Sequence, residues 1–233
     1  MKDRRKTLKF ALVKTLPIAV SYFFVAVAFG MLMTQAGYPL PWSLFTSVWV
    51  YSGAFQFVLV SFLAAGAPLL TISLTALFMS SRHIFYGLSF LQEFRRAGKA
   101  FPYLIFGLTD EVYSLFCSLE YPPEVDQPRA MFEIALFSQL YWILGSVAGA
   151  AAGSLLPANV KGIDFCLTAL FVTIVLDQWK NAASRRPALI GFACALVCLA
   201  LLGASRFILP AMMLAAGLLL LDAKFRKEAA HEA

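Results

Sequence analysis

The stretch LPIAVSYFFVAVAFGMLMTQ, residues 16–35, is almost entirely apolar. It opens a longer run, residues 15–81, that contains no Asp, Glu, Lys, Arg or His. A helix needs roughly 20 mostly apolar residues to cross about 30 Å of hydrocarbon. The stretch therefore predicts a membrane-spanning helix, and the length of the uncharged run predicts further spans directly after it.

The composition of the whole chain agrees with this interpretation. Of its 233 residues, 61% are hydrophobic and only 14% are charged, and the mean hydropathy is +0.77. Soluble domains carry about 25% charged residues, so this chain has too few charges to cover a soluble surface. We expect an integral membrane protein.

Continuous apolar segments recur along the chain, and we take them as candidate spans. A transmembrane β-barrel would show short segments of alternating polarity instead. The predicted fold is therefore all-α, a polytopic transmembrane helical bundle. It has seven or eight spans, because the last segment is short and residues 41–91 could contain a re-entrant piece. The segments lie near residues 15–35, 41–63, 68–91, 101–119, 131–156, 163–179, 187–204 and 207–221.

The net charge of +6 is concentrated next to these spans. This distribution is typical of cytoplasmic loops beside anionic headgroups and does not indicate a nucleic-acid-binding surface. The first cluster and the apolar run after it resemble a signal peptide, but the apolar sequence continues well past a cleavage site, so we expect a retained first helix. The clusters are Lys2–Lys14, Arg95–Lys99, Lys180–Arg186 and Lys224–Lys227.

We treat residues 1–233 as a single transmembrane domain with a Pro-rich loop, residues 120–130, near its middle. The segments on the two sides of this loop are faintly similar, since residues 44–57 align without a gap to residues 166–179. A duplication of halves 15–119 and 131–221 explains the similarity, and internal repeats with broken or re-entrant helices are common in secondary transporters. Chance matching of apolar residues explains it equally well.

Two adjacent carboxylates, Asp110 and Glu111, lie in the middle of the predicted span 101–119. A carboxylate at the centre of a bilayer costs about 2.5–3.5 kcal/mol on insertion scales. One interpretation is structural, in which the acids pair with Arg82 or lie at the membrane interface. The other is functional, in which they form a proton relay or a substrate site in a polar cavity.

Arg82 and His83 are the cations closest to this depth in the apolar body. A guanidinium binds a carboxylate through two parallel hydrogen bonds, and this partner is either an acidic side chain or an amino-acid substrate. His83 has an ordinary pKa near 6.5, which suits proton exchange, although it could also be a hydrogen-bonded packing residue. Tyr86 follows Arg82 by four positions and shares a helix face with it.

Gly53 and Gln56 indicate an interrupted helix in the segment YSGAFQF, residues 51–57. A helix unwound at Gly53 would offer backbone groups to a zwitterion, and Gln56 would add a neutral donor and acceptor. Close packing through small residues is the alternative. In the span 131–156, Gly145, Gly149 and Gly153 recur every four residues, and such a stripe lets two helices approach closely.

The remaining polar residues of the apolar segments predict no metal and no cofactor. Asp177 and Gln178 close an apolar run at a membrane interface, and Arg206 lies between two short spans as a turn residue. The cysteines form no CxxC pair, and we expect no redox or metal role for them. They are Cys117, Cys166, Cys194 and Cys198.

Several of these motifs together resemble the branched-chain amino acid exporters of the AzlC/YgaZ type, over about residues 15–180. The resemblance implies the large subunit of a two-component exporter in the inner membrane, paired with a small hydrophobic AzlD/YgaH-like subunit. It also implies valine, leucine, isoleucine or related amino acids as substrates, with protons as the driving ion. The motifs are AFG (28–30), GAFQF (53–57), SRHIFYGLSF (81–90), TDEVYSL (109–115) and GIDFCLTALFV (162–172).

The hypothesis that results is a secondary transporter and not an enzyme. Gly53, Gln56, Arg82 and Tyr86 would bind the substrate, while Asp110, Glu111 and His83 would couple its movement to protons. A passive channel or pore for small solutes and a purely structural membrane subunit are the alternatives. An intramembrane enzyme is disfavoured, because no protease pair or metal-ligand cluster is visible in the apolar segments.

Overall fold

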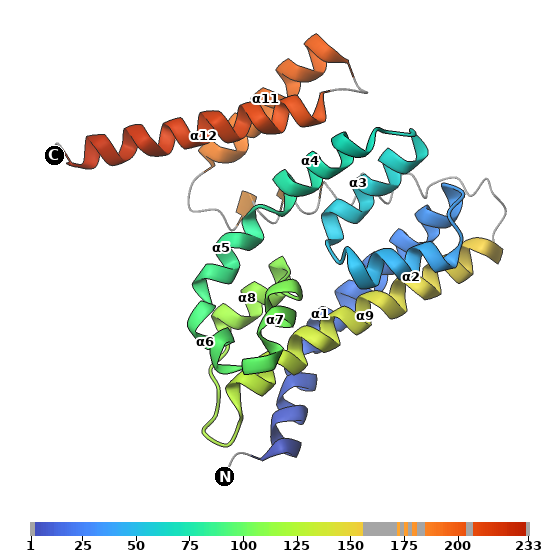
Figure 1. Ribbon diagram of the computed structural model, residues 1–233, viewed down its shortest axis with the longest axis vertical. Coiled ribbons are helices and arrows are strands. Elements are labelled where there is room, and N and C mark those ends of the chain that lie inside the picture. Colours follow the sequence, from blue (N-terminus) through green and yellow to red (C-terminus); the bar gives the residue numbers. More distant parts are fainter. Residues whose placement is uncertain are drawn as a thin grey trace. The chain divides into compact units, whose positions relative to one another are not determined.

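The computed structural model describes residues 3–155, 185–203 and 207–231, and a few helical residues between the first two ranges. Within these ranges every regular element is a helix and none is a strand, which confirms the all-α class (Figure 1). Cys166, Asp177, Gln178 and Arg206, as well as most of the predicted span 163–179, lie outside the described residues.

The chain forms two compact units. The first combines Met1–Gly66 with Ser80–Thr168, and the second combines Ala67–Met79 with Ala169–Ala233. In the second unit, α11 (Arg186–Leu202) packs against α12 (Ile208–His231), and the sulfur-bearing residues Cys194 and Cys198 are buried. The first unit contains most of the residues that the sequence singled out.

Two long helices form the scaffold of the first unit, and shorter helices pack against them. They are α1 (Arg4–Gln35) and α9 (Gln127–Leu155), and among the described residues they alone are long and apolar enough to cross a membrane as single helices. The Thr7 hydroxyl accepts from the Asp126 amide at 3.1 Å, and the Thr34 hydroxyl donates to the Ala150 carbonyl at 3.2 Å. The two helices therefore run parallel and side by side (Figure 1).

The glycine stripe of α9 lies against α1. A Cβ atom added to Gly149 would overlap the backbone of Val27, and one added to Gly145 would come within 2.8 Å of the Ala26 Cβ. Gly30 of α1 approaches the backbone of α9 equally closely. Glycine removes the side chain that would otherwise separate the helices, so their backbones are in direct van der Waals contact.

Two of the predicted spans are interrupted. The segment 41–63 forms α2 (Leu40–Trp49) and α3 (Gly53–Ala64), and the segment 101–119 forms α7 (Phe101–Phe106) and α8 (Asp110–Ser118). The predicted span 101–119 is therefore not one continuous helix, and Asp110 and Glu111 begin its second part. In the first interruption Tyr51 has φ +35°, a left-handed conformation that is uncommon for a residue with a side chain.

The segment 68–91 is also divided. It forms α4 (Leu69–Ser80) and α5 (Arg82–Ser89), followed by α6 (Leu91–Arg96) and a 3-10 turn, η1 (Gly98–Ala100). Arg82 is thus the first residue of a short helix and does not lie within a long one. Since several predicted spans are short or interrupted, the count of seven or eight crossings and the repeat of two halves stay predictions.

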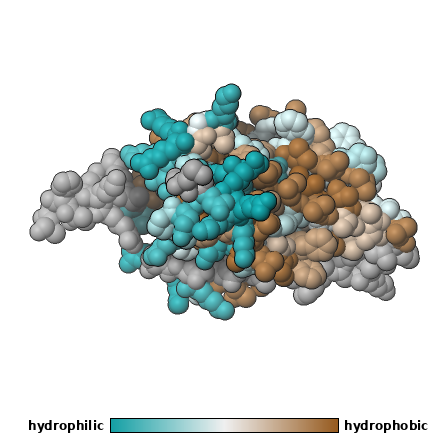
Figure 2. Space-filling view, turned by 90° about the horizontal axis from the view of Figure 1, so that it is seen from below, coloured by the Kyte–Doolittle hydropathy of each residue, from teal (hydrophilic) through white to brown (hydrophobic). Residues whose placement is uncertain are grey.

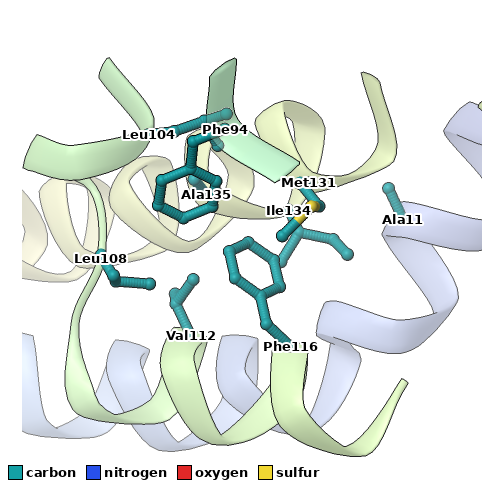
Figure 3. Packing of buried hydrophobic residues seen from close by; sticks show 9 residues of the cluster. All are labelled: Ala11, Phe94, Leu104, Leu108, Val112, Phe116, Met131, Ile134 and Ala135. Atoms are coloured by element: carbon teal, nitrogen blue, oxygen red, sulfur yellow. The ribbon is translucent and has the colours of Figure 1, made fainter. Parts of the chain in front are cut away.

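A hydrophobic cluster holds α7 and α8 against α9 and α1. Its members come from five helices and from the connection between α7 and α8, and the side chains of α8 point toward those of α9 (Figure 3). Leu108 belongs to that connection, so the second interruption is anchored from inside the core. The cluster consists of Ala11, Phe94, Leu104, Leu108, Val112, Phe116, Met131, Ile134 and Ala135.

Large apolar side chains also cover the outside of the scaffold. Leu16, Phe24 and Leu144 are all exposed on α1 and α9. Seen from the end at which the N-terminus lies, hydrophilic residues gather in one area of the surface and apolar residues cover the neighbouring area (Figure 2). Exposed apolar helix faces of this extent are what a protein immersed in lipid presents.

Candidate functional site

The candidate site begins at the first turn of α8. Thr109 is its N-cap, and the Thr109 hydroxyl accepts from the Val112 amide at 3.4 Å. Asp110 and Glu111 follow at once, where the free amides of a helix N-terminus and the helix dipole favour negative charge. The interruption at residues 107–109 therefore gives both carboxylates a stabilising position that the middle of a continuous helix would not provide.

Asp110 forms an ion pair with Arg82. Arg82 Nη2 lies 2.6 Å from Asp110 Oδ2, and the two side chains are 37% and 39% exposed. The pair joins the start of α5 to the start of α8, two short helices that follow interruptions of the chain. At this partial exposure the contact is accessible from the surface of the unit, so a charged ligand could reach either partner.

Glu111 has a different partner, the buried Tyr22 of α1. The Tyr22 hydroxyl donates to Glu111 Oε2 at 2.6 Å, and the Thr109 hydroxyl lies 2.6 Å from the same Tyr22 oxygen. Because the single phenolic proton is used on Glu111, the Thr109 hydroxyl donates to Tyr22. Tyr22 is only 5% exposed, whereas Glu111 itself is exposed, so this chain of hydrogen bonds runs from the interior to the surface.

The interruption between α2 and α3 contributes two buried polar side chains, Tyr51 and Gln56. Tyr51 is buried, and its hydroxyl interacts with both Tyr22 and Glu111. Gln56 is 0% exposed, and neither end of its amide is hydrogen-bonded within the described part of the chain. A buried amide without a partner costs free energy, which a bound polar ligand or water would recover.

Trp142 of α9 links the two interruptions. Its ring packs edge-on against Tyr22, with ring centroids 5.4 Å apart. A Cβ atom on Gly53 would lie 3.3 Å from the same ring, which is tighter than ordinary contact. Gly53 therefore lets the start of α3 approach Trp142, beside the tyrosine that binds Glu111.

The structure brings together most of the residues predicted for the site, but not all of them. His83 and Tyr86 lie beside the Arg82–Asp110 pair and interact electrostatically with Asp110. The Tyr86 ring stacks on Tyr113 of α8 at a centroid distance of 4.2 Å. No hydrogen bond or ion pair within the described ranges joins Gln56 to this group.

Four functional candidates were missed in the sequence: Tyr22, Tyr51, Thr109 and Trp142. A signal existed for Thr109, because a threonine followed by two acidic residues is a typical helix start. It would have predicted the interruption before Asp110. No local pattern marks Tyr22 or Trp142, which become site residues only because α1 and α9 pack side by side.

Tyr22→Phe tests whether the hydrogen bonds of Tyr22 are part of the fold. The variant keeps the packing against Trp142 but leaves Glu111 and Thr109 without their buried partner. We expect a loss of about 1–3 kcal/mol in the free energy of unfolding, measured in detergent. Tyr38→Phe is the matched control, because the Tyr38 hydroxyl makes only a 3.5 Å contact with the Leu63 carbonyl. Equal stability of both variants would contradict the described geometry.

These features define a class: a helical membrane protein with a polar, charged site where its helices are interrupted. Comparison with known families narrows the class, because the sequence model described as "AzlC protein" matches residues 17–156. The chain belongs to the AzlC family. The matched region contains every residue of the site described above.

Relatives in other organisms cover nearly the whole chain. A membrane protein of Helicobacter pylori is 36% identical over 98% of this chain and 99% of its own length. The branched-chain amino acid transport protein AzlC of Bacillus subtilis is 36% identical over 88% of this chain and 81% of its own. The inner membrane protein YgaZ of Escherichia coli is 36% identical over 86% and 82%. No solved structure matches this chain.

Proposed function

We propose that this protein is a secondary transporter that exports branched-chain or related hydrophobic amino acids in exchange for protons, as a multi-pass protein of the inner membrane. The name of the Bacillus subtilis relative supports the substrate class. The observation that carries the proposal is the pair of adjacent carboxylates at the start of α8, each held by a different partner. Asp110 forms an ion pair with Arg82, and Glu111 accepts a hydrogen bond from Tyr22, so we assign the two carboxylates different roles.

In the proposed mechanism Arg82 changes partner. While the site is empty, Asp110 neutralises the guanidinium. An arriving amino acid offers a carboxylate to Arg82 and an ammonium group to Asp110, so the charges of the zwitterion replace those of the ion pair. Tyr86 lies beside Asp110 and contributes a hydroxyl to the same ligand. An exchange of ion pairs leaves no charge uncompensated at membrane depth, which keeps its free-energy cost low.

The start of α3 supplies further contacts in this proposal. Ser52, its N-cap, makes no side-chain capping bond, so the first-turn amides after Gly53 are available to a polar ligand. Gln56 adds its unpartnered amide. Phe29 and Phe57, whose buried rings pack edge-on at 5.8 Å, are the apolar residues that we propose to contact a branched aliphatic side chain.

Glu111 is the group that we propose to carry the coupling proton, assisted by His83. Tyr22 and Thr109 extend from Glu111 into the interior as a continuous chain of hydroxyl groups. Ionisable residues at membrane depth are typical of proton relays in transporters. Protonation of Glu111 would remove the charge that holds the Tyr22 hydroxyl, which would link the proton to the packing of α1 against α8.

The family resemblance also supports a partner, and we propose a small hydrophobic AzlD/YgaH-like membrane subunit. Co-expression of the two proteins, with an affinity tag on this chain alone, tests the assembly. We expect the small subunit to copurify in detergent at a constant ratio. A chain that purifies without it and transports at full rate would contradict the partnership.

Transport in proteoliposomes tests the proposed function. Vesicles that contain the purified protein, together with the proposed subunit, are loaded with labelled valine and placed in a pH gradient. We expect valine to move against its own gradient and the flux to saturate with valine concentration. A passive channel predicts a flux that neither saturates nor runs uphill. Absence of uphill movement under every gradient would exclude proton exchange.

A further inference from the structure

Gln139 of α9 satisfies a backbone group that the first interruption leaves free. In a continuous helix the Val48 carbonyl would accept from the amide of residue 52. That bond is lost, because α2 ends at Trp49 and Ser52 has an extended conformation, with φ −132°. Gln139 Nε2 donates to the Val48 carbonyl at 3.1 Å instead. A side chain from another helix thus replaces the missing helical hydrogen bond.

The other end of the same amide is bonded to the helix that precedes the second interruption. The Tyr103 hydroxyl of α7 donates to Gln139 Oε1 at 2.6 Å. The backbone carbonyl of Tyr103 accepts from the Gly107 amide at 2.7 Å, which is the bond that closes α7. Gln139 is only 6% exposed, so both of its hydrogen bonds are shielded from water.

This arrangement fixes the orientation of the amide. A carbonyl can only accept, so the NH₂ group must face Val48. The carbonyl oxygen of Gln139 then faces Tyr103, whose hydroxyl must donate. Straightening α2 into α3 would move the Val48 carbonyl, and the buried NH₂ group of Gln139 would have to follow it or lose its partner. A displaced Gln139 amide would in turn shift the acceptor of the Tyr103 hydroxyl on α7.

We infer that Gln139 is a positioning residue whose amide couples the two helix interruptions, in addition to the ring contact of Tyr51 with Phe106 at 6.0 Å. The coupling concerns the geometry of the backbone and holds whatever the cargo of the protein is. It also explains why a buried polar side chain of α9 lies between α2 and α7. Within the described part of the chain, Gln139 is the side chain that bonds to both Val48 and Tyr103.

Hydrogen exchange of the full-length protein, followed by mass spectrometry, tests the coupling. Tyr103→Phe removes the α7 hydroxyl that donates to Gln139 and keeps the aromatic ring. We expect it to raise exchange about three- to tenfold both in residues 103–115 and in residues 44–57, which Tyr103 does not bond directly. Gln139→Met, which keeps the volume of the side chain but removes both bonds, should raise exchange in both segments at least as much.

Ser138→Ala is the matched control for these variants. Ser138 is the neighbouring buried residue on α9, and its hydroxyl bonds to the Ile134 carbonyl of its own helix at 2.8 Å. We expect exchange in both segments to match that of the unmodified protein. The inference is overturned if Tyr103→Phe changes residues 103–115 alone, or if Gln139→Met changes neither segment. Transport measurements play no part in this test, so its result is separate from that of the proposed function.

Discussion

Glu111→Gln is expected to abolish proton-driven accumulation of valine while leaving the exchange of external for internal valine intact. Glutamine keeps the size of the side chain and an oxygen that accepts from Tyr22, so the site is preserved. It cannot take up a proton, and the proton gradient therefore loses its route into the transport cycle. The two modes are compared in proteoliposomes, with and without a pH gradient, at equal protein content.

Two companion variants make this result specific. Asp110→Asn removes the counter-charge of Arg82, so we expect it to impair both accumulation and exchange. Glu120→Gln changes an exposed carboxylate outside the site and should leave both modes unchanged. Normal accumulation by the Glu111→Gln protein would remove this carboxylate from the coupling mechanism, even if transport itself is confirmed.

Gly149→Ala is expected to destabilise the protein strongly, although it adds a single methyl group. The new Cβ atom would overlap the backbone of Val27, and no flexible side chain is present to move away. Relieving the overlap requires α1 and α9 to separate over several turns. Overpacking of this kind costs about 1–3 kcal/mol or more, and we expect a value at the upper end because backbone meets backbone.

Gly191→Ala in α11 is the matched control. A Cβ atom at this position meets no atom within 4 Å, so the substitution should be neutral or slightly stabilising. Thermal unfolding in detergent, followed by tryptophan fluorescence, compares the two variants. An equally stable Gly149→Ala protein would show that α1 and α9 do not approach as closely as described. The contact of Tyr22 on α1 with Glu111 on α8 would then also be in question.

Parts of the site could be predicted because charge is informative in an apolar chain. Arg82, Asp110 and Glu111 stand out against long uncharged segments, and membrane depth demands a partner for each. Gly53 also indicated an interruption close to where α3 begins. The interruption before Asp110 was not predicted, because hydropathy averages over residues 107–109 and does not detect a helix that stops and restarts.

The remaining site residues were not predictable by the same reasoning. Tyr22 and Trp142 are aromatic residues among many others, and nothing local distinguishes one that faces a carboxylate from one that faces lipid. Gln139 was not predictable either, since its role depends on hydrogen bonds to two residues far away in the chain, Val48 and Tyr103. Such roles depend on contacts between residues far apart in the chain, and periodicity carries no information about them.

The amino-acid sequence by itself determined that this protein is helical and belongs in a membrane, because too few charges are present to hydrate its surface. It also determined that its charged side chains need partners. Only the tertiary structure decided which partners these are: Arg82 for Asp110, and Tyr22 for Glu111. The physical reason is that solvation by lipid depends on composition, whereas an ion pair or a hydrogen bond depends on distances of about 3 Å between atoms, which exist only after the helices have packed.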